Sequence, residues 1–210
     1  AAQRKAAEEI RAVFADRATV LLRGVTGSGK TEIYMHFAAE VLARGGQVLL
    51  LVPEIALTPQ MMAKFTAYFG ENVAMLHSGL QLTERYDQWK RIRRGDVRVV
   101  LGTRSAVFAP MENIGLIVID EEQEGTYKSE MSPRYHARDV ARFRAAQEGA
   151  LLLLASATPS VESFYRAREG RYELLTLKNR YGAARLPDVA ILDMAAQPLG
   201  AQSASLSEQL

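Results

Sequence analysis

The fold of this chain can be worked out from eight consecutive residues, Gly24-Val25-Thr26-Gly27-Ser28-Gly29-Lys30-Thr31. A short apolar run at 19–22 stands before them, and a helical pattern at 31–44 follows and ends at two glycines. Glycines in such a turn let backbone N–H groups point inward around a phosphate at a helix N-terminus, where the helix dipole favours an anion. This spacing between a strand and a helix predicts a phosphate loop.

Two residues of the loop have distinct predicted roles. The Lys30 ammonium would reach the β- and γ-phosphates of a nucleotide, and the Thr31 hydroxyl would ligate Mg²⁺. Magnesium usually keeps several waters and needs only one or two protein ligands. The alternative is a glycine-rich turn without a ligand, but the agreement of all eight positions and of both flanking elements favours the phosphate loop. Every residue from Gly24 to Thr31 is therefore a candidate nucleotide ligand.

Helices and apolar strands alternate along most of the chain. The predicted helices cover 3–14, 31–44, 59–70, 83–94 and 138–147, and the predicted strands cover 19–22, 47–52, 73–76, 97–101, 115–119 and 151–155. Strands that are apolar at consecutive positions are buried on both faces, as in a parallel sheet covered by helices. We therefore expect a three-layer, doubly wound α/β domain with a mostly parallel sheet over residues 1–178. Glycine, proline, glutamine and serine in 179–210 predict an exit linker, with one candidate strand at 189–192.

Composition narrows the class of protein further. The chain has 210 residues, of which 48% are hydrophobic and 24% charged, as in ordinary globular domains. Its longest apolar run, 150–155, is far shorter than the roughly 20 residues that cross a bilayer. It contains no cysteine, which excludes disulfides and thiolate metal sites within these residues and fits a reducing compartment. We expect a soluble, unsecreted protein, and the net charge of +2 says little about its partners.

A group of acidic residues follows the predicted strand at 115–119. An ATPase needs one acid that holds Mg²⁺ through water and a second that orients the attacking water, at the carboxyl end of a neighbouring strand. Asp120 fits the metal role, and Glu121, one residue farther from the strand, fits the water-orienting role. The alternative is a solvated acidic turn, which is disfavoured because a buried strand leads directly into these acids. Lys30, Asp120 and Glu121 are the candidate catalytic residues.

Several longer stretches resemble motifs of superfamily two helicases, and together they resemble the PriA-type primosomal helicases. The matching stretches are Asp120-Glu121-Glu122-Gln123 (motif II), Ser156-Ala157-Thr158-Pro159 (motif III), 51–60 (motif Ia), 102–110 (motif Ib), the strand-end loop Leu76-His77-Ser78-Gly79 and 134–139. The resemblance covers nearly the whole chain. One departure is Gln123, where this family often has histidine, and it bears on the coupling of motif II to motif III.

The resemblance implies a function and a set of partners. It implies the first RecA-like lobe of an ATP-dependent 3′-to-5′ DNA helicase that acts at stalled replication forks in primosome assembly and replication restart. ATP and Mg²⁺ would bind here, and forked or single-stranded DNA and the primosome and replication-restart proteins would be partners of a monomeric, bacterial, cytoplasmic and nucleoid-associated protein. The family's second lobe, its N-terminal DNA-binding domain and its cysteine-rich zinc insertion lie outside this chain, so Zn²⁺ would bind outside it and the chain alone would be nearly inactive.

The resemblance also implies further site residues. Gln3 could read the adenine edge, although a glutamine on an exposed helix face is the equal alternative. Strand-end loops can contact DNA phosphates without reading bases, and the candidates there are Thr58, Ser78, Gly79, Thr103 and Arg104. For Thr58 the alternative is a helix N-cap.

The segment 125–136 resembles an aromatic-rich loop that couples DNA sensing to ATP hydrolysis in related helicases. Tyr127, Lys128 and Arg134 are its candidate DNA contacts, since aromatic rings stack on unpaired bases and cations hold phosphates. The alternative is a surface loop anchored by its tyrosines. A basic run at 90–94 is either a DNA patch or a solvated helix face.

Two other functions share the phosphate loop. A nucleotide-binding metabolic enzyme such as a kinase would have no need for motifs Ia and Ib or for Thr158-Pro159. A degenerate module that only docks partners would have no need for intact Lys30, Thr31, Asp120 and Glu121. Both alternatives predict that DNA does not stimulate ATP turnover.

Overall fold

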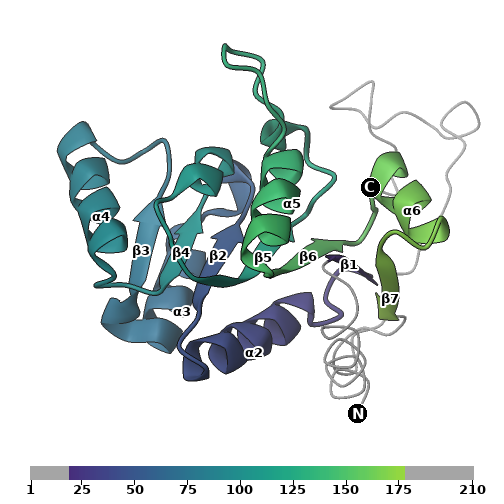
Figure 1. The fold of residues 1–210 in the computed structure, drawn as a ribbon, viewed down its shortest axis with the longest axis horizontal. Helices are drawn as coiled ribbons and strands as arrows, with labels where there is room; N and C mark the ends of the chain where they lie inside the picture. Colours follow the sequence, from purple (N-terminus) through teal and green to yellow (C-terminus); the bar gives the residue numbers. More distant parts are fainter. Residues whose placement is uncertain (1–18, 178–210) are drawn as a thin grey trace, which may run out of the picture.

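The computed structural model describes residues 19–177, which form one seven-stranded sheet between two layers of helices (Figure 1). Its strands are β1 (Thr19–Gly24), β2 (Gln47–Leu51), β3 (Val73–Leu76), β4 (Val99–Gly102), β5 (Ile114–Asp120), β6 (Leu151–Ser156) and β7 (Glu173–Leu177). Its α-helices are α2 (Lys30–Ala43), α3 (Pro59–Phe69), α4 (Leu82–Arg94), α5 (Ala137–Glu148) and α6 (Val161–Arg168). The strand order is β3-β4-β2-β5-β6-β1-β7, and every pair is parallel, so the expected doubly wound α/β fold is confirmed.

Within 19–177, each predicted helix and strand is present, with ends shifted by two residues at most. Two further elements, α6 and β7, were not predicted from the sequence. Helix α6 has only eight residues, too short for a strong helical period, and β7 is an edge strand whose partner β1 lies far away in the sequence. The predicted helix at 3–14, the candidate strand at 189–192 and the linker at 179–210 lie outside the described residues.

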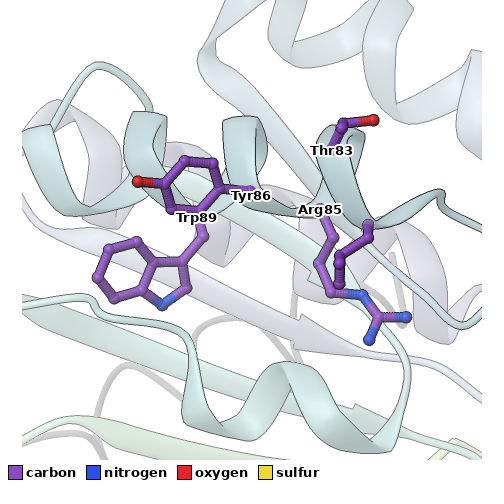
Figure 2. A pocket seen from close by; sticks show the side chains of 5 residues that line it. Thr83, Arg85, Tyr86 and Trp89 are labelled. Carbon is purple, nitrogen blue, oxygen red and sulfur yellow. The ribbon is translucent and has the colours of Figure 1, made fainter.

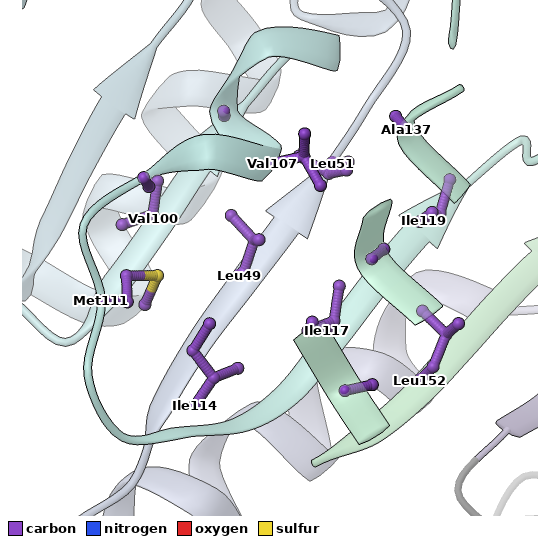
Figure 3. Packing of buried hydrophobic residues seen from close by; sticks show 14 of the residues in the cluster. Leu49, Leu51, Val100, Val107, Met111, Ile114, Ile117, Ile119, Ala137 and Leu152 are labelled. Atoms are coloured by element: carbon purple, nitrogen blue, oxygen red, sulfur yellow. The ribbon is translucent and has the colours of Figure 1, made fainter. Parts of the chain in front are cut away.

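Side chains of each strand alternate between two cores, one on each face of the sheet. In β2, Val48 and Leu50 pack with α2 and α3, whereas Leu49 and Leu51 pack against the face that α4, α5 and α6 cover. Figure 3 shows the second core, where Leu49 of β2 and Ile117 of β5 take part and Ala137 of α5 lies near Ile119. A fully buried Leu or Ile contributes about 1.5–3 kcal/mol, so continuous apolar strands stabilise the fold only when both faces are covered.

The functional candidates collect at the carboxyl edge of this sheet. The phosphate loop follows β1, Asp120 ends β5 and Glu121 follows it, and Ser156 ends β6, which pairs with both of those strands. The loops after β2, β3 and β4 meet beside them: the Val52 N–H donates to the Gly102 carbonyl (2.9 Å), and the Thr103 N–H donates to the Leu76 carbonyl (3.0 Å). Among the described residues, no helix is both long and apolar enough to cross a membrane.

Candidate nucleotide site and its surroundings

The phosphate loop makes a tight turn between β1 and α2. Gly27 and Gly29 have φ angles of 75° and 83°, in the left-handed region that side chains disfavour. Gly24 has a different reason to lack a side chain, because a Cβ there would lie 2.5 Å from the Ser28 hydroxyl. The Ser28 N–H donates to the Val25 carbonyl (3.0 Å), which closes the turn. The glycines at these positions are therefore a geometric requirement of the loop.

The loop and the acids after β5 line one cavity of about 350 Å³, which extends from Thr26 to Glu32 and includes Asp120 and Glu121. The buried Ser28 hydroxyl has no hydrogen-bond partner among the described residues. Lys30, whose side chain is buried, donates to the Gly24 carbonyl (3.0 Å), and its Nζ lies 3.7 Å from the Glu121 carboxylate. An orphaned donor, a fixed ammonium and carboxylate oxygens fit a nucleotide phosphate with Mg²⁺.

Asp120 and Thr31, the two predicted magnesium ligands, meet through Tyr34. The Tyr34 hydroxyl lies 3.1 Å from Asp120 Oδ2 and 3.2 Å from Thr31 Oγ1. Burial, followed by the nearby Glu121 charge, raises the pKa of Asp120, while the hydrogen bond from Tyr34 opposes that shift. Burial also raises the pKa of Tyr34, so this hydroxyl keeps its proton. Sequence reasoning missed Tyr34; its only signal was that positions three apart on a helix share a face.

Glu121 has an unusual backbone conformation for a residue with a side chain. Its φ angle is 45°, and non-glycine residues in this region cost about 1–3 kcal/mol. The turn is held by the Glu121 N–H, which donates to Asp120 Oδ1 (3.1 Å), and by the Glu124 N–H, which donates to the Glu121 carbonyl (2.9 Å). Strain of this kind gathers at functional sites, and here it accompanies a carboxylate that faces Lys30.

Gln123 connects motif II to motif III. Its amide Nε2 donates to Glu121 Oε2 (2.9 Å), and its Oε1 accepts from the Ser156 hydroxyl (2.6 Å). Ser156 in turn accepts from the Thr158 N–H (2.9 Å). An amide has both a donor and an acceptor, so glutamine can make both contacts. The helicase family that this sequence resembles often has histidine at this position.

Glu122, the third acid of motif II, points away from the cavity into a buried network. Its carboxylate is paired with Arg138 of α5 at 3.0 Å and accepts from Ser163 Oγ (2.8 Å) and from the Ser160 N–H (2.7 Å). Ser160 is the N-cap of α6. The network therefore ties the end of β5 to the first turns of two helices.

The structure separates the predicted DNA contacts into exposed and buried residues. Thr58, Ser78, Gly79, Lys128 and Arg134 are exposed. Thr58 is also the N-cap of α3, where its hydroxyl accepts from the Met61 N–H (3.2 Å). Thr103 is only 3% exposed, which leaves its side chain little surface for a phosphate. Gln3 lies outside the described residues.

Tyr127 requires a correction. Its side chain is 1% exposed, and its hydroxyl donates to the Asp120 carbonyl (2.7 Å), so the ring cannot stack on a base in this conformation. The tyrosine anchors the loop to motif II, which was the alternative interpretation. Spacing alone cannot distinguish an anchoring tyrosine from a stacking one, because both occur in polar loops.

Arg104 links the loop that follows β4 to the segment 125–136. Its guanidinium donates to the carbonyls of Thr126 (3.2 Å) and Lys128 (2.7 Å), and lies 5.9 Å from the centre of the Tyr135 ring. Phe108 packs edge-on against the same ring, with centroids 4.9 Å apart. The predicted DNA contact after β4 thus holds the segment 125–136, which follows Asp120 and Glu121 in the chain.

The basic run at 90–94 lies on α4, at the β3 end of the sheet. Lys90 lies 4.1 Å above the exposed Tyr86 ring, and Arg93 lies 5.2 Å above Trp89. Figure 2 shows both aromatic side chains at an open groove that Leu82, Thr83 and Arg85 also line. This face belongs to a different part of the molecule from the nucleotide cavity.

Comparisons with known proteins agree with this geometry. The sequence profile described as DEAD/DEAH box helicase matches residues 1–166. The chain is 52% identical over 194 residues to the replication restart protein PriA of Bacillus subtilis strain 168, covering 91% of this chain and 24% of that protein. It is 47% identical over 183 residues to PriA of a Synechocystis strain, covering 85% of this chain and 22% of that protein. The chain thus spans about a quarter of the length of the curated relatives it matches.

A solved structure supports the fold assignment. RecG bound to a three-way DNA junction matches with a TM-score of 0.64 and 25% identity, over 88% of this chain and 24% of that one. The sheet order, the phosphate loop and these similarities confirm the RecA-like fold and the expected resemblance to PriA-type helicases. This chain belongs to the DEAD/DEAH box helicase family.

Proposed function

We propose that this chain is the ATP-binding motor lobe of a 3′-to-5′ DNA helicase that acts at stalled replication forks in primosome assembly and replication restart. The observation that carries the proposal is the link between motifs II and III, in which Gln123 contacts both Glu121 and Ser156. A nucleotide site that only bound ATP would not need its water-orienting acid joined to a second strand end.

The residues of the cavity divide the work of ATP hydrolysis. Backbone N–H groups of the phosphate loop and the Lys30 ammonium would hold the β- and γ-phosphates, and Thr31 and Asp120 would hold Mg²⁺, Asp120 through water. When bound, Mg²⁺ neutralises charge on the phosphate oxygens. The Glu121 carboxylate orients the attacking water and accepts its proton. Lys30, already fixed by the Gly24 carbonyl, supplies a preorganised positive charge as negative charge shifts in the transition state.

The whole protein's partners are part of this proposal. We propose that forked or single-stranded DNA contacts five exposed residues, namely Thr58, Ser78, Gly79, Lys128 and Arg134. Arg104 supports this surface through its hydrogen bond to the Lys128 carbonyl. Primosome and replication-restart proteins, a bacterial cytoplasmic and nucleoid-associated location, a monomeric state and a zinc insertion outside this chain follow from the similarity to PriA. The metabolic-enzyme alternative has no use for motifs Ia and Ib or for Thr158-Pro159.

The decisive experiment measures ATP turnover by the intact helicase that contains this lobe, with and without single-stranded or forked DNA. We expect DNA to stimulate turnover, and Lys30→Ala to abolish it while DNA binding persists, because the γ-phosphate loses its fixed counter-charge. Arg142→Ala, an exposed change on α5, is the control. DNA-independent turnover would favour a metabolic enzyme, and turnover within a few-fold of wild type in Lys30→Ala would disprove the phosphate-loop assignment.

A further inference from the structure

Tyr34 of α2 lies between the two residues that are predicted to hold magnesium, Thr31 of α2 and Asp120 of β5. It is one helical turn beyond Thr31, its side chain is 1% exposed, and its ring packs in the core between the sheet and α2. Its hydroxyl lies 3.1 Å from Asp120 Oδ2, although 86 positions separate the two residues. The same oxygen lies 3.2 Å from Thr31 Oγ1. One buried hydroxyl therefore touches both predicted magnesium ligands.

Hydrogen-bond chemistry determines the direction of this bridge. An ionised carboxylate can only accept, so the single Tyr34 proton goes to Asp120. The contact with Thr31 must then be made with the threonine proton, which points to Tyr34 Oη. In that arrangement the Thr31 O–H bond points to Tyr34. The lone pairs of Thr31 Oγ1 therefore point away from Tyr34 and are free for a cation. A hydroxyl that ligates a metal ion needs this orientation, because its lone pair has to face the ion.

We propose that Tyr34 is a positioning residue of the magnesium site, which orients the Thr31 hydroxyl and the Asp120 carboxylate through its own hydroxyl. The proposal rests on the proposed function, since it requires Mg²⁺ to bind with the nucleotide at Thr31 and Asp120. Groups of this kind behind metal ligands are worth about 10- to 100-fold in metal affinity. If Tyr34 were purely structural, its hydrogen bonds to Thr31 and Asp120 would serve only to satisfy its own buried hydroxyl. Loss of that hydroxyl would then lower stability without a specific effect on Mg²⁺ affinity.

The test uses the 210-residue chain and a fluorescent, non-hydrolysable ATP analogue, titrated with MgCl₂. We expect Tyr34→Phe to raise the Mg²⁺ concentration at half-maximal enhancement of binding about 10- to 100-fold. Analogue affinity without Mg²⁺ should stay within about two-fold of wild type, because no phosphate contact is removed. Tyr172→Phe is the matched control: it removes another buried tyrosine hydroxyl, one that accepts from Arg166 (2.9 Å) near β7.

Two further measurements separate the outcomes. For each variant, the Tm with the analogue alone is subtracted from the Tm with the analogue and Mg²⁺. A general loss of stability lowers both Tm values and therefore leaves this difference unchanged. In an Asp120→Asn background, Tyr34→Phe should add little, because the two changes break the same bridge.

An unchanged Mg²⁺ dependence in Tyr34→Phe would overturn the proposal, as would equal weakening of analogue binding with and without Mg²⁺. Absence of Mg²⁺-dependent binding in the wild-type chain would instead contradict the proposed function. The two failures are thus distinguishable.

Discussion

At the scale of single residues, Glu121 shows how the site combines strain with chemistry. Its φ angle of 45° places a residue with a side chain in the left-handed region, while its carboxylate contacts both Lys30 and Gln123. Asparagine or glycine would suit such a turn better, but neither carries the carboxylate that the proposed mechanism requires. Strain of this kind at a cavity-lining carboxylate agrees with the proposed role of Glu121.

We predict that Glu121→Gly is more stable than Glu121→Ala by about 1–2 kcal/mol, because only glycine enters the left-handed region without steric cost. Urea unfolding of the two variants of the 210-residue chain measures the difference. Both variants should lose ATP turnover in the intact helicase equally, since both lack the carboxylate. Equal stability would mean that the turn relaxes to a negative φ when the side chain is shortened.

At the scale of elements, the buried network around Glu122 holds β5, α5 and α6 together. The ion pair with Arg138 has side chains that are 0% and 10% exposed, and two serine hydroxyls complete it. Removing one partner of such a pair leaves a buried charge without compensation, which costs more than the pair itself contributes.

We predict that Arg138→Met destabilises the chain by about 3–5 kcal/mol in urea unfolding. Arg142→Met, on the same helix, should cost about 0–1 kcal/mol, because its contact with Asp139 (3.6 Å) is solvent-exposed. Adding Glu122→Gln to Arg138→Met should restore part of the loss, since no unpaired charge is then buried. Similar costs for the two arginine variants would argue that solvent reaches the Glu122 carboxylate.

The segment 125–136 carries two exposed cations, Lys128 and Arg134, and one buried anchoring residue, Tyr127. Arg104 and Tyr127 hold the segment to the sheet edge, and Lys128 and Arg134 project from it. Its anchored side contacts Asp120, so movement of the segment on DNA binding would reach the proposed catalytic acids.

We predict that Lys128→Ala with Arg134→Ala lowers the DNA-stimulated ATPase rate of the intact helicase much more than the DNA-free rate. If each side chain neutralises one phosphate of single-stranded DNA, the slope of log affinity against log salt should become shallower by about 1.4. Tyr127→Ala should lower both rates and Tm together, because this ring is part of the core. An unchanged salt slope in the double variant would remove these residues from the DNA contact.

At the scale of the whole molecule, the described residues supply the phosphate loop and both acids, but they contain only one lobe. The resemblance implies that arginines from a second lobe complete the ATP site. An arginine of this kind is worth roughly 10³ to 10⁵ in rate where it has been measured.

We therefore predict that the 210-residue chain binds ATP but turns it over at least about 10³-fold more slowly than the intact helicase, and that DNA does not stimulate it. A coupled assay of phosphate release measures this difference, and the rate of the Lys30→Ala variant is subtracted as the blank. Robust DNA-stimulated turnover by the chain alone would show that its own residues complete the site.

The sequence by itself determined the fold class, the phosphate loop and the two acids that share its cavity. These features have local signals: apolar strands between helical patterns, glycines at fixed spacing, and Asp120 and Glu121 directly after a strand. Gly24 to Thr31 are neighbours in the chain, so their spacing alone describes their geometry.

Only the tertiary structure decided which distant residues meet. It placed β6 between β1 and β5, brought Ser156 to Gln123, buried Tyr127 under motif II and set Tyr34 against Asp120. Such contacts depend on strand order and register, which are decided by the packing of whole helices against the sheet and leave no local signal in the chain. A tyrosine in a helix or loop looks the same in sequence whether it is exposed or buried, because its surroundings come from segments far away.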